Sequence, residues 1–287
     1  MPPTKILAIA VFSILIVGCA TGPRPYDPAK SAALNLAELG GIDGLKDQTV
    51  SPADYSNIQS SGASVLTDIG WSGASYSAPP PGISGGLSFG LGLLSMIRST
   101  DSPAKHRQLV AWMPQSMASD TNDAQEKMRS ITISAIDKAL AEMGWQRSEF
   151  ELSRRESKII AAAAFHSMDV PQRCAGLSAP LTEKCIVGAY IQTPVETNNS
   201  PAIITQSSQP SYVFKGDAIF NGYISIVTRG QEINLQQFYI ALSNHLPPWS
   251  YFYIPPKAAM KAHAAGNLDY PQIYFRGKME LFVTAQK

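Results

Sequence analysis

The stretch that decides the fold is residues 108–152, QLVAWMPQSMASDTNDAQEKMRSITISAIDKALAEMGWQRSEFEL. Its first part, 108–113, is an apolar run that predicts a strand. Pro114 ends that strand, because proline has no backbone N–H to donate to a sheet. After a long middle part, the alternation of residues 145–152 predicts another strand. The stretch therefore predicts a strand, a helix and a strand in succession.

The middle of this stretch has the periodicity of one amphipathic helix. Ser119 or Asp120 can cap its first turn by accepting a bond from a backbone N–H group. The apolar positions, which recur at intervals of three and four, are Met128, Ile131, Ala135, Ala139, Leu140 and Met143. Gly144 suits the left-handed position that follows a helix. We therefore expect one long helix that ends near residue 143.

Strands dominate the rest of the C-terminal part. A capping box at Ser153 and Glu156 predicts a second helix over 154–168, with a strand over its apolar residues as the alternative. Further strands are expected at 186–193, 212–214, 218–227, 237–242, 251–254 and 278–284. Because strands outnumber helices and come in runs, we expect an α+β domain over 104–287, with a mainly antiparallel β-sheet and one or two packed helices.

Residues 19–103 are expected to form a tether rich in Gly, Pro and Ser. A short helical pattern within 31–45 is interrupted by glycines, and three successive prolines at 79–81 mark a stiff boundary. The segment 82–97, GISGGLSFGLGLLSMI, follows this boundary and carries no charge.

Glycines in this uncharged segment are spaced for helix packing. Gly82, Gly86 and Gly90 would share one helix face, where small residues let two helices approach closely. Sixteen residues at a rise of 1.5 Å span about 24 Å, just short of a bilayer crossing. A helix that packs against copies of itself or enters a membrane is one interpretation, and a Gly-rich loop or buried hairpin is the other.

The N-terminus carries the most specific signal in the chain. Lys5 precedes an apolar run over 6–17, which has the length of a signal-peptide core and is too short to span a bilayer. The run ends in Ile16-Val17-Gly18-Cys19. This sequence resembles the lipobox of bacterial lipoproteins.

The resemblance implies removal of a signal peptide over residues 1–18 and acylation of Cys19. Stable anchoring by lipid needs more than one acyl chain, and the two or three chains of the lipoprotein family meet that need. Ala20 rather than Asp follows the cysteine, which in enteric bacteria implies an outer-membrane anchor that faces the periplasm. An ordinary secretory signal with a chance cysteine is the alternative.

Composition limits the partners. Charged residues make up 16% of the chain and the net charge is +1, so no basic surface for nucleic acid is expected. Membrane attachment would then depend on lipid rather than on attraction to anionic headgroups. No cofactor is expected.

Two cysteines remain after Cys19. Cys174 and Cys185 form an even pair in an oxidising compartment, which favours a disulfide between them. A zinc site is the weaker alternative, because no histidine lies near the pair.

The search for catalytic residues is mostly negative. Ser84 lies in a G-x-S-x-G match, but three prolines precede it where a nucleophile elbow needs a strand. Ser102 and Lys105 match S-x-x-K without the K-T-G element that accompanies it in penicillin-binding proteins. The histidines, none of which has a second metal ligand at helical or hairpin spacing, are His106, His166, His245 and His263. We therefore expect no catalytic residue and no metal site.

An aromatic segment lies between two proline pairs at 245–256, HLPPWSYFYIPP. Its aromatic residues Trp249, Tyr251, Phe252 and Tyr253 would form an exposed stacking surface for a glycan or a partner protein. The alternative, which we favour, is an edge strand whose aromatic side chains alternate into the core.

These features favour a non-enzymatic, membrane-anchored component of a multi-subunit envelope assembly, such as a secretion or conjugation machine. A homo-oligomer or an envelope protein complex is the expected state. A peptidoglycan- or glycan-binding module is the first alternative, and an envelope hydrolase with an unrecognised site is the second.

Overall fold

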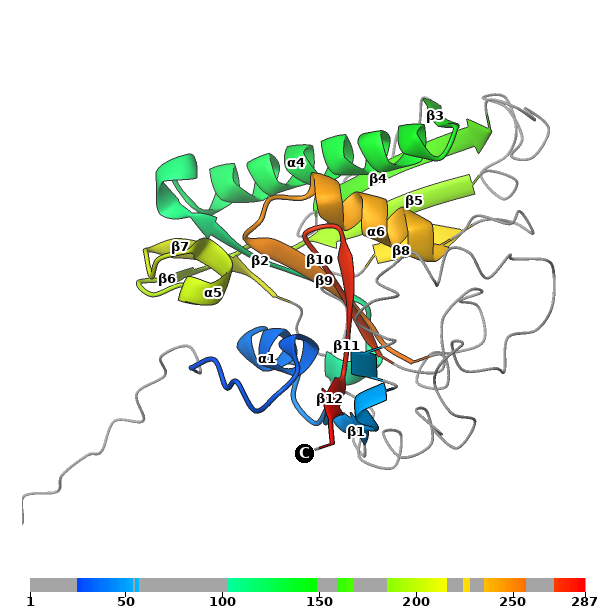
Figure 1. The fold of residues 1–287 in the computed structure, drawn as a ribbon. Helices are drawn as coiled ribbons and strands as arrows, with labels where there is room; N and C mark the ends of the chain where they lie inside the picture. The colour runs from blue at the N-terminus through cyan, green and yellow to red at the C-terminus, as the bar shows by residue number, and fades with distance from the viewer. Residues whose placement is uncertain are drawn as a thin grey trace, which may run out of the picture.

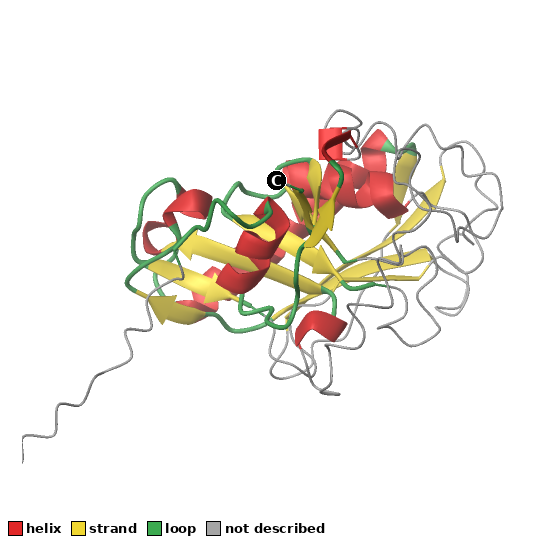
Figure 2. Cartoon of the chain, turned by 60° about the horizontal axis from the view of Figure 1, so that its bottom comes forward, coloured by secondary structure: helices red, strands yellow, loops and turns green. Residues whose placement is uncertain are grey.

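A computed structural model describes residues 25–53, 55–56, 103–148, 159–167, 185–215, 224–227, 235–256 and 271–286. These residues form an α+β fold, as predicted (Figure 1). Its main sheet has six antiparallel strands, a second antiparallel sheet has four, and two short strands form a parallel pair. Figure 2 shows the strands of the main sheet with helices on both sides.

The six-stranded sheet has the strand order β11-β10-β9-β2-β7-β6. Its members are β2 (Gln108–Pro114), β6 (Val195–Thr197), β7 (Ser211–Phe214), β9 (Ser250–Ile254), β10 (Gln272–Phe275) and β11 (Lys278–Leu281). The four-stranded sheet has the order β3-β4-β5-β8, with β3 (Trp145–Ser148), β4 (Ile159–Ser167), β5 (Cys185–Ile191) and β8 (Ile224–Val227). The parallel pair joins β1 (Gln48–Val50) to β12 (Val283–Ala285).

The helices in the described part of the chain are α1 (Ala32–Leu39), α4 (Thr121–Glu142), α5 (Ala202–Thr205) and α6 (Leu235–His245). Two 3-10 turns, η1 (Pro103–Lys105) and η2 (Gln115–Met117), flank β2. The long helix α4 packs against α6 and crosses β3, β4 and β5 (Figure 1). No helix among the described residues is long and apolar enough to span a membrane.

Helix α4 follows its sequence pattern closely. Of the two candidate caps, Asp120 is the one used: its carboxylate accepts bonds from the backbone N–H groups of Asn122 and Asp123, both at 2.8 Å. The helix ends before Gly144, which has a φ of 72°, the left-handed conformation that glycine adopts without strain. The predicted apolar positions Met128 and Leu140 are buried.

Strand β9 lies at the centre of the main sheet, between β10 and β2. The prediction of an edge strand is therefore wrong. The prolines do not prevent central pairing, because all four lie outside the strand, which covers only Ser250–Ile254. Successive side chains of β9 point to opposite faces of the sheet, one covered by α1 and the other by α6. Tyr251 donates to the carbonyl of Leu36 in α1, whereas the ring of Phe252 meets Tyr239 of α6.

Two segments were assigned the wrong element from sequence. The expected strand at 237–242 is part of α6, because Phe238, Tyr239 and Leu242 are spaced to bury one helix face. The expected helix over 154–168 is instead β4 over Ile159–Ser167, which was the alternative. Pairing with β3 on one side and β5 on the other outweighs the helix propensity of its four alanines.

Residues 25–50 of the predicted tether belong to the folded core. Helix α1 contributes Ala33, Leu36 and Ala37 to the same buried cluster as the main sheet. Its glycines do not interrupt the helix, since Gly40 and Gly41 follow its last turn. Strand β1 pairs with β12 near the C-terminus, so the domain boundary at residue 104 was placed too late.

The partly buried carboxyl of Glu280 should make the stability of the fold depend on pH. It lies on the edge strand β11, where burial raises the pKa of its carboxyl above the ordinary value of 4.5 and Lys278 partly opposes this. The native state therefore binds more protons than the unfolded state, and the stability fully present below pH 4.5 falls as the pH rises through the raised pKa.

Glu280→Gln removes this charge. The unfolding free energy of the variant should therefore increase, relative to that of the wild type, as the pH is raised from about 4 to about 7. Urea unfolding at both pH values measures the gain. A difference that stays constant with pH would contradict the burial of this carboxyl.

Candidate functional site

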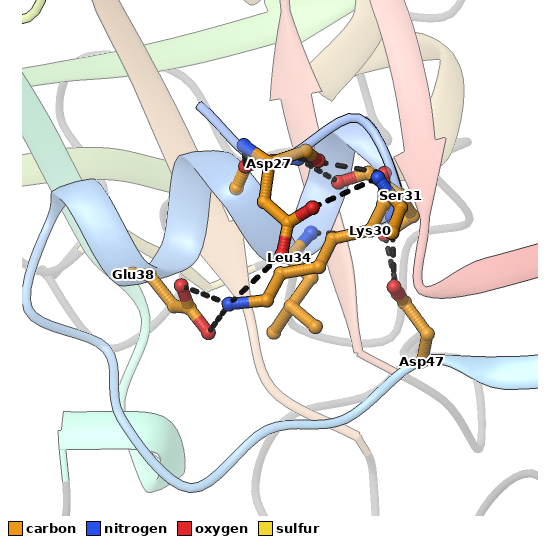
Figure 3. Close-up of polar contacts among 8 residues, drawn as sticks. Asp27, Lys30, Ser31, Leu34, Glu38 and Asp47 are labelled. Atoms are coloured by element: carbon orange, nitrogen blue, oxygen red, sulfur yellow. Dashed lines mark hydrogen bonds and ion pairs between the residues drawn. The ribbon is translucent and has the colours of Figure 1, made fainter. Parts of the chain in front are cut away.

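The described fold begins at Pro25, six residues after Cys19, and the first helix is fastened there by polar side chains. Ser31 caps α1: its Oγ accepts a bond of 3.0 Å from the backbone N–H of Leu34. The carboxylate of Asp47 accepts a 2.7 Å bond from the backbone N–H of Ser31 and a second bond from the Ser31 hydroxyl (Figure 3). The loop before β1 therefore holds the N-terminus of α1.

Asn35 ties the segment before the helix to the helix itself. Its Oδ1 accepts from the backbone N–H of Asp27 at 2.8 Å, and its Nδ2 donates to the carbonyls of Asp27 and Ser31, both at 2.9 Å. The side chain is almost fully buried. A buried amide that makes three such bonds fixes the path of the backbone, because breaking any of them would leave a polar group unsatisfied.

An ion pair completes this arrangement on the outer side of α1. Lys30 Nζ lies 2.8 Å from both carboxylate oxygens of Glu38 and 3.9 Å from Asp27 Oδ2 (Figure 3). We call the set Asp27, Lys30, Ser31, Asn35, Glu38 and Asp47 the N-terminal clamp. Each neutral hydrogen bond contributes about 1 kcal/mol to stability, and the half-buried ion pair contributes no more than that. The clamp therefore stabilises this segment because it makes several such contacts, not because any one of them is strong.

The far end of α1 is fixed by the main sheet. The hydroxyl of Tyr251 donates to the carbonyl of Leu36 in α1 at 2.5 Å. From the same strand, the hydroxyl of Tyr253 donates to the carbonyl of Ala104 in η1 at 2.7 Å. Burial raises the pKa of both phenols far above their ordinary value, so they remain protonated donors. The segment that follows the predicted anchor is therefore held at both ends of its first helix.

The clamp ties together the turn before α1, the helix itself and the loop before β1. It contains carboxylates, an amide, a hydroxyl and one ammonium group, each engaged with a neighbour in the same segment. These contacts fix the path of the backbone between Asp27 and Asp47.

Sequence reasoning missed the clamp. The one local signal was Ser31 three residues before Leu34 at the start of an apolar set, which is a helix-start pattern. Asp47 lies 16 residues further along, and no spacing rule connects it to Ser31.

The predicted aromatic surface is not exposed. Trp249 is 8% exposed, and Tyr251, Phe252 and Tyr253 are fully buried. The interpretation of these residues as an exposed glycan- or partner-binding surface is therefore wrong, and the favoured interpretation, in which their side chains enter the core, agrees with their burial. The physical reason is that β9 is covered on both faces, by α1 on one and by α6 on the other.

Other predicted site residues have different outcomes. The lipidation site Cys19, the glycines Gly82, Gly86 and Gly90, and the serines Ser84 and Ser102 lie outside the described residues. Cys185 begins β5 opposite Phe165, but Cys174 lies outside, so the disulfide stays a prediction.

The histidines do not form a common site in the described part of the chain. His245 at the end of α6 lies 2.6 Å from Glu142 at the end of α4, through Nε2 and Oε1, and so links two packed helices. His106 follows η1, His166 lies in β4, and His263 lies outside. Among the described residues no three His, Cys, Asp or Glu side chains are grouped to hold a metal ion.

Comparison with known proteins adds no assignment: no protein-family model, curated protein or solved structure matches the chain.

Proposed function

We propose that this chain is a bacterial envelope lipoprotein, acylated on Cys19, anchored in the outer membrane and facing the periplasm. The observation that carries the proposal is the sequence Ile16-Val17-Gly18-Cys19 at the end of an apolar run that follows Lys5. Acyl chains on the thiol supply the membrane affinity that a net charge of +1 would not.

We further propose that the protein acts as a non-enzymatic structural or assembly component of a multi-subunit envelope complex, of the secretion or conjugation type. The N-terminal clamp supports this role, because it holds α1 to its neighbouring loops, and Tyr251 in turn bonds α1 to the main sheet. A component of a large assembly needs a fixed orientation at the membrane, which a long loose tether would not give. The spacing of Gly82, Gly86 and Gly90 supports close packing between copies.

One extraction experiment tests both parts. The full chain is extracted from membranes in mild detergent, and the masses of its N-terminal peptide and of the native complex are measured. We expect a diacylglycerol-modified Cys19 at the N-terminus and a complex several times heavier than the chain. The Cys19→Ser variant should move from the membrane fraction to the soluble fraction, because lipid is the only anchor proposed.

A second variant separates the assembly from the anchor. Gly86→Leu with Gly90→Leu should remain acylated and membrane-bound but lose the heavy complex, because two leucines would keep neighbouring helices apart. A monomer in both wild type and variant would contradict the assembly role. An unmodified Cys19 would contradict the lipoprotein assignment.

A further inference from the structure

Four large apolar side chains are exposed in the part of the chain that the structure describes. They are Val195 at 66%, Tyr26 at 49%, and Met117 and Ile203 at 39% each. Val195 in β6 and Ile203 in α5 belong to elements that follow one another in the chain, and β7 comes next. Met117 in η2 joins them, because the backbone N–H of Gln115 donates to the carbonyl of Pro210, just before β7, at 3.0 Å.

The chain enters the described fold in the same region. In both views the segment that begins at Pro25 lies at the end of the molecule that carries β6, β7 and α5, while the C-terminal end of α4 and β3 lie at the opposite end (Figures 1 and 2). Tyr26 is the second residue of that segment, and the N-terminal clamp fixes its neighbour Asp27. The segment that carries Tyr26 therefore lies at the same end of the molecule as the elements that carry Val195 and Ile203.

The reach of the anchor is short. Tyr26 is seven positions after Cys19 in the chain, and a fully extended chain of that length covers about 24 Å. A compact domain of some 200 residues is on the order of 40 Å across. An acylated Cys19 lies at the bilayer surface. The end of the domain that carries Pro25 must therefore face the lipid, because the end that carries β3 could reach the lipid only if the clamped segment turned around.

We propose that the end of the domain formed by Tyr26, Met117, Val195 and Ile203 lies against the lipid surface of the membrane in which Cys19 is anchored. This inference rests on the proposed acylation of Cys19 and adds the orientation of the domain. Tyrosine suits the headgroup level, since its ring is apolar and its hydroxyl remains hydrated. The aliphatic side chains add apolar area that would otherwise face water.

Charged groups of both signs lie at this end of the domain. The carboxylates of Glu196, Asp120 and Asp123 all lie close enough to the Tyr212 phenol to raise its pKa, although burial is the larger cause. Lys127 pairs with Asp123 at 2.8 Å. Positive charge lies here as well, because the Arg276 guanidinium donates to the carbonyl of Ile204 in α5 at 3.0 Å, so contact with the bilayer would depend on apolar burial and the acyl anchor.

Photocrosslinking in intact cells tests this orientation. A benzophenone amino acid is introduced into the full chain at Tyr26, Val195 or Ile203, and in a matched control at Ala141, which is exposed at the C-terminal end of α4. We expect lipid adducts at the three face positions in at least tenfold higher yield than at Ala141. Equal yields at all positions, no adducts, or adducts to proteins alone would overturn the proposal.

The same samples separate this inference from the proposed function. The mass of the N-terminal peptide reports whether Cys19 carries lipid. Loss of acylation would refute the lipoprotein assignment itself. An acylated chain without lipid adducts at Tyr26, Val195 and Ile203 would refute only the proposed orientation.

Discussion

Gly40→Ala is expected to destabilise the folded chain by about 3 kcal/mol, although the position follows a helix and has an ordinary backbone conformation with a φ of −78°. A Cβ at residue 40 would overlap the hydroxyl oxygen of Tyr251 and press on both γ-methyl groups of Val110 at 3.3 Å. Overpacking of this kind costs about 1–3 kcal/mol. Displacing the tyrosine also breaks its buried bond to the Leu36 carbonyl, which costs about 1–3 kcal/mol more.

Urea unfolding of the acyl-free Cys19→Ser chain measures this loss, and Gly41→Ala is the matched control. A Cβ on Gly41 would meet nothing within 4 Å, but its φ of +75° disfavours any other residue. The control should therefore cost only the backbone strain, about 1 kcal/mol. If Gly41→Ala proved the more costly of the two, close contact between α1 and the sheet would not be the controlling factor.

A double variant isolates the contact. Tyr251→Phe removes the oxygen that the new methyl group would meet, and the carbonyl of Leu36 keeps a donor in the backbone N–H of Gly40. Gly40→Ala combined with Tyr251→Phe should therefore be at least 1 kcal/mol more stable than the sum of the single changes predicts. Strict additivity would show that the two residues do not meet.

Local patterns were sufficient where an element carried its own start, period and stop. Helix α4 has Asp120, a regular apolar spacing and Gly144, and it was predicted almost to the residue. The turn at Arg276-Gly277, which joins β10 to β11, carries a local signal in its glycine, because both residues have a positive φ. Short apolar runs failed, because six residues such as 237–242 fit a strand or a helix equally well.

Contacts between distant parts of the chain left no local pattern. Strand β1 meets β12 across more than 230 residues, and Tyr251 reaches Leu36 across 215. The tether prediction failed for this reason: 25–50 is poor in strong local signals and becomes ordered by the sheet on which it packs. The aromatic segment 245–256 raises the same difficulty, because its composition fits an exposed surface and a central strand alike.

Phe252→Ala is expected to cost about 4 kcal/mol of unfolding free energy, the largest loss that we predict. The ring is fully buried, stacks on Tyr274 with centroids 5.1 Å apart, and meets Tyr239 at 5.3 Å. Truncating a buried phenylalanine typically costs about 3–5 kcal/mol, through lost burial and the cavity that remains. Because whole domains are stable by only about 5–15 kcal/mol, this variant should approach unfolding.

Phe252→Leu is the matched control, since it keeps much of the apolar volume and should cost about half as much. The denaturant midpoint of the acyl-free chain measures both, and the alanine variant should unfold at least 1 M earlier in urea than the wild type. A loss below about 1 kcal/mol is typical of surface positions and would contradict the central placement of β9. The same comparison is a necessary control for any glycan-binding assay with aromatic variants of β9. If a variant is not shown to be folded, loss of binding would indicate loss of the core and not loss of a recognition site.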